Sequence, residues 1–160
     1  MRFKGNFAYR IDIGRVRVTN EDQASVLINA DGDVLMVVCD GMGGHNKGDY
    51  ASRTAVSVLA EAFKNKPKFI HPFFARRWLS SQIHRANNEI YDAAFSNDAY
   101  KDMGTTLVAA LILEDHIIIA NIGDSRAYSV RHEGMKRLTS DQTYVDYLYR
   151  TGKISKDEIA

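Results

Sequence analysis

One stretch of the chain, residues 34–45, constrains the fold more than any other. An apolar run, VLMVVC, is followed at once by Asp40 and by the glycine-rich loop GMGGH. The run has the length of a strand, and its unbroken apolar character predicts a strand that is buried on both faces. Asp40 then lies at the end of that strand, where the glycines let the backbone turn sharply and approach a ligand closely. Taken alone, the stretch fits a strand, a turn and an acid-capped helix as well as it fits a ligand site.

The flanking residues predict strands, then two helices, then strands again. Turn residues and apolar patterning place strands over residues 6–13, 24–29, 34–39, 105–113, 116–122, 125–130 and 135–138. The Asp-Gly turn in residues 30–33 predicts a hairpin, which puts the loop before residue 24 near Asp40. Helices are expected over residues 47–64, from Pro72 onward and over residues 143–151, and residues 154–160 are typical of the start of another. Because strands and helices are segregated rather than alternating, the pattern predicts the α+β class.

The two long helices carry apolar stripes that predict which sides they bury. The stripe of the first consists of Ala51, Ala55, Val58, Leu59 and Ala62. The stripe of the second consists of Phe74, Trp78, Leu79, Ile83, Ala86, Ile90 and Ala93. Aromatic side chains in such a stripe usually belong to the core, so we expect Phe74 and Trp78 there rather than in a cofactor site.

Composition and charge indicate one globular domain over residues 1–160. The chain is 45% hydrophobic and 26% charged, as ordinary globular proteins are. A net charge of +1 gives no strong global field toward nucleic acid or a membrane, so neither is expected as a partner. No apolar run is long enough to span a bilayer, and the first residues lack the apolar segment of a signal peptide. Cys39 is the only cysteine, so no internal disulfide can form and a cytoplasmic location is expected.

The glycine loop does not match the common phosphate-binding loops. Asp49 and Tyr50 stand where the P-loop needs Lys and Ser or Thr, and the dinucleotide pattern fails at Asn46. Cys39 has no arginine six residues later, as a cysteine phosphatase loop requires, and we interpret it as a small buried hydrophobe. Asp40 would repel a bare phosphate, so a hard cation such as Mg²⁺ or Mn²⁺ between acid and phosphate makes better sense.

Three further segments offer polar groups that alone are ordinary surface features. The loop RVRVTNED places Arg17 five residues before Asp22. These side chains could form a solvated surface cluster, or Arg17 could bind a phosphate beside a carboxylate that supports a metal ion. Asp124 lies at a strand end in the turn of NIGDSR and could equally be a turn aspartate. Among the five histidines, His45 alone lies in the glycine loop, where it could donate a proton or contact a substrate.

Five motifs taken in order give a specific resemblance. GRVRVTNED, CDGMGGHNKGDYAS, MGTT, NIGDSR and LTSDQT together resemble the metal-dependent protein phosphatases of the 2C type, most closely the bacterial branch. The resemblance implies two packed antiparallel sheets flanked by helices. It also implies hydrolysis of phosphoserine and phosphothreonine in protein substrates, often opposite a Ser/Thr kinase. Two Mn²⁺ or Mg²⁺ ions, and a third held more weakly, would activate a water that attacks phosphorus without a covalent intermediate.

The resemblance assigns a role to each matching residue. Asp40 would bridge the two metal ions, and the carbonyl of Gly41 would bind one of them. Asp22 would support the metal site, largely through water. Arg17 would grip the phosphate, and Asp124 would serve the third, weaker metal ion. Residues 143–160 match the start of the mobile flap beside the site.

Two departures from the family pattern bear on function. Gln142 stands where bacterial relatives usually have His. The family also continues with further strands that bring two more metal-binding aspartates, so this chain is expected to lack the C-terminal strands and to carry one half of the metal site. Open sheet edges would then favour self-association. Two alternatives therefore stay open: a phosphatase-like module that binds phosphopeptide without turnover, and a metal-dependent nucleotide phosphohydrolase.

Overall fold

The computed structural model describes residues 5–43 and 47–155 and has one main antiparallel sheet. Its strands are β1 (Asp22–Ile28), β2 (Val34–Met42), β3 (Gly104–Thr105), β4 (Leu107–Ile112) and β5 (Ile117–Ile122). The order is β1-β2-β4-β5, and β3 pairs with the end of β2. A separate hairpin contains β6 (Tyr128–Arg131) and β7 (Gly134–Arg137). The helices are α1 (Lys47–Lys64), α2 (Pro72–Ser96), the short 3-10 helix η1 (Asp98–Tyr100) and α3 (Tyr144–Arg150).

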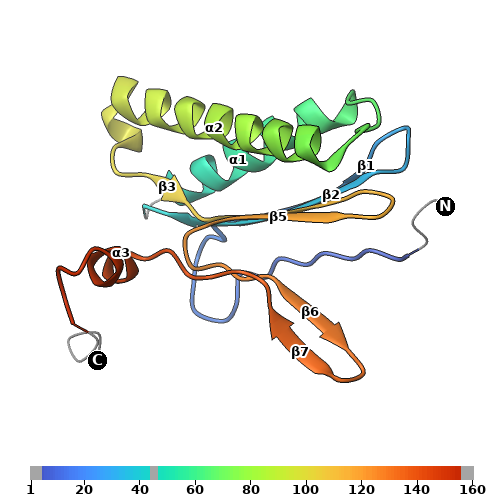
Figure 1. Cartoon of the computed structure of the whole chain (residues 1–160). Coiled ribbons are helices and arrows are strands. Elements are labelled where there is room, and N and C mark those ends of the chain that lie inside the picture. Colours follow the sequence, from blue (N-terminus) through green and yellow to red (C-terminus); the bar gives the residue numbers. More distant parts are fainter. Residues whose placement is uncertain (1–4, 44–46, 156–160) are drawn as a thin grey trace.

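Helices α1 and α2 cover one face of the main sheet, whereas residues 5–20 and the β6–β7 hairpin lie on its other side (Figure 1). The core forms between the sheet and the two helices and includes Leu35 and Val37 of β2, Leu59 and Phe63 of α1, and Leu79 of α2. The α+β class predicted from the sequence is confirmed. No helix among the described residues is long and apolar enough to cross a membrane.

Strand β2 is buried along the whole face toward the helices, but on its other face only at the start, where Val34 is 1% exposed and Met36 is half-buried. The prediction of burial on both faces therefore fails along the second half of the strand. Leu35, Val37 and Cys39 point to the helices and are at most 1% exposed. The alternate side chains of Val38 and Met42 are 49% and 53% exposed. The physical reason is the layer arrangement, because side chains alternate along a strand and the helices cover only one side. The uncovered face is called the open face below.

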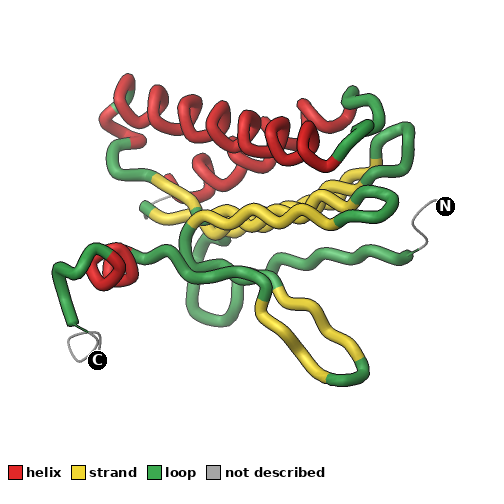
Figure 2. Tube along the Cα trace, viewed as in Figure 1, coloured by secondary structure: helices red, strands yellow, loops and turns green. Residues whose placement is uncertain are grey.

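Most predicted elements are present, and the first predicted strand is absent. Residues 6–13 form no strand and run as an extended segment beside the sheet (Figure 2). Loose alternation is insufficient where no neighbouring strand supplies a ladder of hydrogen bonds. The helix over residues 47–64 matches α1, and Pro72 begins α2 as expected. Of residues 154–160, Ile154 and Ser155 are not helical and the rest lie outside the described residues.

The apolar stripe of α2 is only partly buried. Trp78 packs beside Phe63 and Phe69, with ring centroids 5.8 and 5.3 Å apart, as predicted for a core aromatic residue. Phe74, in contrast, is 60% exposed, so its prediction as a core residue is wrong. The face of α2 that meets the core is set by Ala75 and Leu79, which are fully or almost fully buried. Phe74 shares a face with Trp78, four residues later, but it lies in the first turn of α2 and packs against His71 and Phe73 instead of the core.

Candidate metal centre

The two predicted metal-side carboxylates lie next to each other across the first hairpin. In the antiparallel register of β1 and β2, Asp22 is the direct partner of Asp40. Direct partners point to the same face of a sheet, and here that face is the open one, because the neighbouring Cys39 points into the core. The Asp-Gly turn produces this register, and Gly32 in it has a φ of +88° as such turns require.

The surroundings of Asp40 raise the pKa of its carboxyl group. The main cause is partial loss of solvent, followed by the negative charge and hydrogen bonding of Asp22. Arg17 opposes the shift, and Asp124 adds a smaller repulsion. Asp40 is nevertheless exposed as a residue, so water screens a part of these interactions. Four of the six predicted site residues are thus within electrostatic reach of one another.

Backbone segments meet very closely beneath the two carboxylates, and this explains two of the glycines. A side chain at Gly41 would collide with the carbonyl of Gly48 and come within 2.6 Å of the carbonyl oxygen of Glu21. A side chain at Gly48 would come within 2.7 Å of the Glu21 carboxylate. The start of α1, the end of β2 and the loop before β1 therefore pack backbone to backbone. Any larger residue at Gly41 or Gly48 would push these segments apart.

Two threonines after α2 hold the backbone of Asp40. The Asp40 N–H donates to Thr106 Oγ1 at 3.0 Å, and the Asp40 carbonyl accepts from the Thr106 N–H at 2.8 Å and from Thr105 Oγ1 at 3.0 Å. Thr106 Oγ1 also lies 2.7 Å from Ser125 Oγ in the turn that carries Asp124. Thr106 thus connects Asp40 to Ser125, the residue after Asp124. Sequence reasoning gave it no role, although it belongs to the MGTT motif.

Ser52 of α1 fixes the loop that leads into Asp22. Its hydroxyl donates to the carbonyl of Glu21 at 2.6 Å, and the Gly41 N–H donates to the same carbonyl at 3.1 Å. Ser52 is fully buried, so its hydroxyl needs such a partner. This role was also missed, because a serine in a helix gives no local signal of a bond to a loop 31 residues earlier.

A shallow hollow of about 460 Å³ opens beside the carboxylates. Its lining consists of Arg17, Val18, Thr19, Glu21, Asp40, Gly41 and Met42. Three of the predicted residues therefore share this hollow, with Asp22 beside it through the strand register and Asp124 in the turn after β5. His45 lies outside the described residues.

These groups have the chemistry of part of a divalent cation site. Two neighbouring carboxylates repel each other, and a Mg²⁺ or Mn²⁺ ion placed between them would remove that repulsion while accepting hard oxygen ligands. The described residues 5–43 and 47–155 nevertheless bring no three His, Cys, Asp or Glu side chains into one metal-holding group. The fit is that of a site with several ligands still to be supplied by water or other groups.

Asp141, just before α3, is paired with arginines rather than with the candidate metal centre. Arg126 donates to both of its carboxylate oxygens, from Nε at 2.9 Å and from Nη2 at 2.6 Å. Arg137 lies 3.5 Å from the same carboxylate. The Arg126 contact lowers the pKa of Asp141. The pairing ties the segment before α3 to the turn of Asp124 rather than to Asp40.

Cys39 lies directly before Asp40 and takes no part in this surface. Its side chain is fully buried, and burial raises the pKa of the thiol to about 12. A thiol of that pKa carries almost no thiolate at neutral pH, so it is a poor nucleophile and a poor metal ligand. The interpretation as a small buried hydrophobe is confirmed.

Comparison with known proteins places these features in one family of sequences. The family model of protein phosphatase 2C matches residues 15–160. The serine/threonine phosphatase stp of Listeria innocua is 42% identical over 150 residues, which make up 94% of this chain and 60% of that protein. Protein phosphatase PhpP of Streptococcus pneumoniae is 33% identical over 147 residues, or 92% and 59% of the two chains.

Solved structures show the same likeness. Serine/threonine phosphatase Stp1 from Staphylococcus aureus has a TM-score of 0.81 at 39% identity, over 92% of this chain and 57% of that one. The catalytic domain of the phosphatase PstP, in complex with two manganese ions, has a TM-score of 0.74 at 31% identity, over 93% and 61%. These likenesses confirm the predicted fold class. The chain spans about 60% of the length of the curated relatives it matches.

Proposed function

The chain belongs to the protein phosphatase 2C family, and we propose that it acts in the metal-dependent hydrolysis of phosphoserine and phosphothreonine in proteins. The observation that carries the proposal is the pairing of Asp22 with Asp40 on the open face, next to Arg17. Two carboxylates and a guanidinium at one hollow suit a cation and a phosphate monoester together. Residues 1–160 act as one domain in this proposal, with residues 143–160 as the start of a flap.

Each residue has a distinct part in the proposed site. Asp40, the carbonyl of Gly41 and the carboxylate of Asp22 would hold the Mn²⁺ or Mg²⁺ ions, with Asp40 as the central ligand. When bound, the ions would lower the pKa of a water molecule and make it the nucleophile. Arg17 orients the phosphate through its planar pair of donors. Asp124 would serve a weaker third ion.

The proposed substrates are phosphorylated proteins, held with their phosphate against Arg17 and contacted by His45. A protein Ser/Thr kinase acting on the same targets is the proposed opposing enzyme, and a cytoplasmic location is proposed for both. The open hollow supports this substrate class, because a phosphorylated side chain of a folded protein can reach a shallow site more easily than a deep one.

The test is phosphate release from a phosphothreonine peptide in the presence of Mn²⁺. The proposal predicts release that depends on Mn²⁺ and falls by about a hundredfold or more in Asp40→Asn, since the bridging charge is lost. Asp92→Asn on the exposed side of α2 is the matched control and should leave the rate unchanged. Equal rates for the chain and its Asp40→Asn variant would contradict the proposal. Faster release from nucleotides than from the peptide would favour a nucleotide phosphohydrolase.

The second candidate is a module that binds phosphopeptide without turnover. No third metal-binding side chain joins Asp22 and Asp40 among the described residues. Such a module would bind the phosphothreonine peptide through Arg17 but release no phosphate at any Mn²⁺ concentration. Peptide binding that is lost in Arg17→Ala, together with no measurable turnover, would support the module. Turnover by the chain would exclude it.

A further inference from the structure

A second surface lies at the opposite end of α1 from the glycine loop. The connection between α1 and α2 and the first turns of α2 form a corner of the molecule (Figure 1). The corner, called the α1–α2 corner below, consists of Lys64, Lys66, Lys68, Ile70, Phe73, Phe74, Arg76 and Arg77. It combines exposed apolar side chains with cations, and the proposed phosphatase site uses none of them.

The apolar part of the corner is exposed more fully than folding requires. Ile70 is 95% exposed, and Phe73 and Phe74 are 54% and 60% exposed. The two phenylalanine rings touch each other edge to face, with centroids 5.6 Å apart, rather than packing into the core. The neighbouring Phe69 is buried, so the connection is anchored while its three large apolar neighbours face the solvent. Large apolar side chains grouped in this way usually mark an interaction site.

The charged part of the corner is positive. Within residues 64–77 there are five cations and no Asp or Glu. Lys68 pairs with Glu114 at 2.9 Å. The other four form no ion pair with the described residues, and Lys66 stacks its ammonium group over the ring of Phe69. The overall charge of +1 therefore hides a local excess of positive charge.

The acidic groups of the neighbouring turns do not cancel this excess. Asp33 is buried and bonded to Asn29, and Asp31 accepts from the backbone N–H of Lys68. Asp115 pairs with His116. With Glu114 engaged by Lys68, these four carboxylates lie on the sheet side of the corner and have their own partners.

We propose that the α1–α2 corner docks the protein on an anionic lipid surface. Ile70, Phe73 and Phe74 would enter the boundary between headgroups and acyl chains, while the surrounding lysines and arginines face the lipid phosphates. Charge complementarity selects this partner. The corner offers cations and apolar side chains together, and an anionic bilayer offers negative headgroups above apolar acyl chains. The attachment is peripheral, which agrees with the lack of a membrane-crossing helix among the described residues.

The position of the corner leaves the candidate metal centre accessible. Helix α1 has 18 residues and runs from the glycine loop to the corner. At a rise of about 1.5 Å per residue, it holds the two surfaces roughly 27 Å apart. A chain docked in this way presents its hollow to phosphorylated segments near the membrane rather than burying it against lipid.

The test is co-sedimentation of the 160-residue chain with vesicles. We expect binding to phosphatidylcholine vesicles that contain about 30 mol% phosphatidylglycerol and at least tenfold weaker binding to pure phosphatidylcholine, because the headgroup charge is then absent. The triple variant Ile70→Ser/Phe73→Ser/Phe74→Ser should weaken binding about tenfold or more. Arg76→Glu/Arg77→Glu should weaken it severalfold and reduce its dependence on salt.

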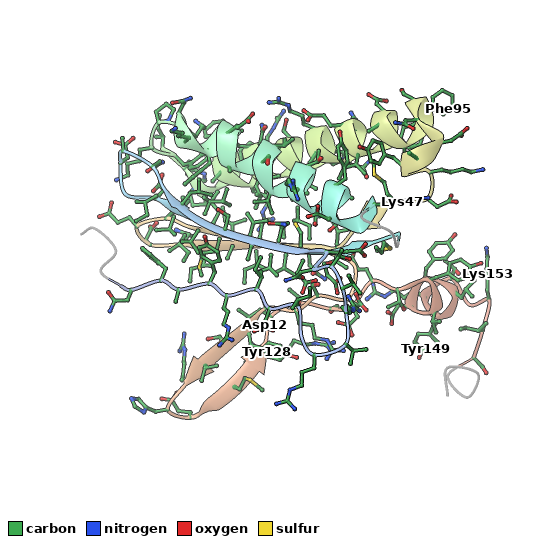
Figure 3. All side chains as sticks on the ribbon, turned by 180° about the vertical axis from the view of Figure 1, so that it is seen from behind. Asp12, Lys47, Phe95, Tyr128, Tyr149 and Lys153 are labelled. Atoms are coloured by element: carbon green, nitrogen blue, oxygen red, sulfur yellow. The ribbon has the colours of Figure 1, made fainter. Side chains whose placement is uncertain are left out.

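A matched control is available on the same helix. Tyr91 and Phe95 are also exposed, at 66% and 84%, but they stand among Glu89 and Asp92 instead of cations. Figure 3 shows Phe95 at the same end of the molecule as Lys47, at the start of α1 and away from the corner. Tyr91→Ser/Phe95→Ser should bind anionic vesicles as the unchanged chain does. Circular dichroism of each variant checks that the fold is retained.

Three results would overturn the proposal. The first is no binding to anionic vesicles by the unchanged chain. The second is equal loss of binding in the corner variant and the Tyr91→Ser/Phe95→Ser control. The third is dimerisation of the free chain, by light scattering, that the corner variant abolishes, since the corner would then be an interface between two copies.

Discussion

At the scale of residues, the site depends on one pair of carboxylates whose charges oppose each other. Asp22 and Asp40 are register partners, and the proximity of Asp22 and partial loss of solvent raise the pKa of Asp40. A raised pKa means that the ionised form of Asp40 is disfavoured in the folded chain. Without a cation, the repulsion between the two carboxylates therefore lowers the stability of the fold. The proposed function requires the pair despite this cost.

We predict that Asp40→Asn stabilises the metal-free chain. The ionised carboxylate destabilises the fold at neutral pH, and this cost disappears as the pH falls through the raised pKa of Asp40, where the folded chain takes up a proton more readily than the unfolded chain. The melting temperature in chelator should rise by a few degrees at most at pH 7, since solvent screens the exposed group. The difference between the two chains should shrink toward pH 4. A lower melting temperature for Asp40→Asn at pH 7 would show that its carboxylate contributes favourable bonds instead.

Thr106→Val tests the anchoring of the Asp40 backbone. The substitution keeps the shape of a buried side chain but removes the oxygen that accepts from the Asp40 N–H and contacts Ser125. An unpaired buried N–H costs about 1–3 kcal/mol, which urea unfolding measures readily. Thr54→Val on α1 makes the same chemical change away from Asp40 and should be close to neutral. Similar losses in the two variants would assign the effect to the valine rather than to the lost hydrogen bond.

Some residues of the site could be predicted from the sequence, and others could not. Asp40 and Asp22 could be predicted because a strand end, a hairpin turn and a motif all indicate them. Thr106 and Ser52 could not, because their hydroxyls bond to segments 66 and 31 residues away. Such bonds form only when β4 and α1 pack against β2, and the local sequence does not predict that packing.

At the scale of elements, helices were easier to predict than the outer strands. The bounds of α1 follow from its apolar period and its terminal residues, and the start of α2 follows from Pro72. Residues 6–13 alternate like a strand but form none. A strand needs a hydrogen-bonded partner strand, and the sequence pattern does not predict which segment would be that partner. The exposure of Phe74 had the same origin, since a stripe shows that a helix has a buried side but not how wide that side is.

The segment before α3 is tied to the end of β5 and the turn after it by the Arg126–Asp141 ion pair and by two hydrogen bonds, from the Gln142 N–H to the Gly123 carbonyl and from Asn121 Nδ2 to the Ser140 carbonyl. We predict that Asp141→Asn loosens residues 138–151, because the amide keeps only one acceptor oxygen for Arg126 and loses the negative charge. Hydrogen exchange at pH 7 should become faster there and remain unchanged in β2 and α1. Since Arg126 lowers the pKa of Asp141, its stabilising effect is present at neutral pH and is lost as the pH falls below about 4.

Asp115→Asn is the control for that experiment, because it removes another exposed carboxylate, which contacts His116 at the turn between β4 and β5. It should leave residues 138–151 unchanged. Equal exchange in the unchanged chain and in Asp141→Asn would mean that α3 is held by its capping box at Thr143 and by packing, and not through Arg126.

At the scale of the whole molecule, the described residues form a sheet with helices on one side and the candidate site on the other. The open face carries the two carboxylates at one end and exposed apolar side chains such as Val38 along its length. The chain covers about 60% of the length of its curated relatives. We propose that sheet edges and this face also provide the surfaces for self-association.

The most direct measurement is a titration of the chain with Mn²⁺, followed by the electron paramagnetic resonance signal of the free ion. Because Asp40 is the carboxylate that the ions would share, the account predicts saturable binding by the unchanged chain and by Asp92→Asn, and at least tenfold weaker binding by Asp40→Asn. Binding should weaken as the pH falls, since protons compete for the same carboxylate. Mn²⁺ binding that is equal in the unchanged chain and in Asp40→Asn would contradict the central claim that this residue forms the metal centre.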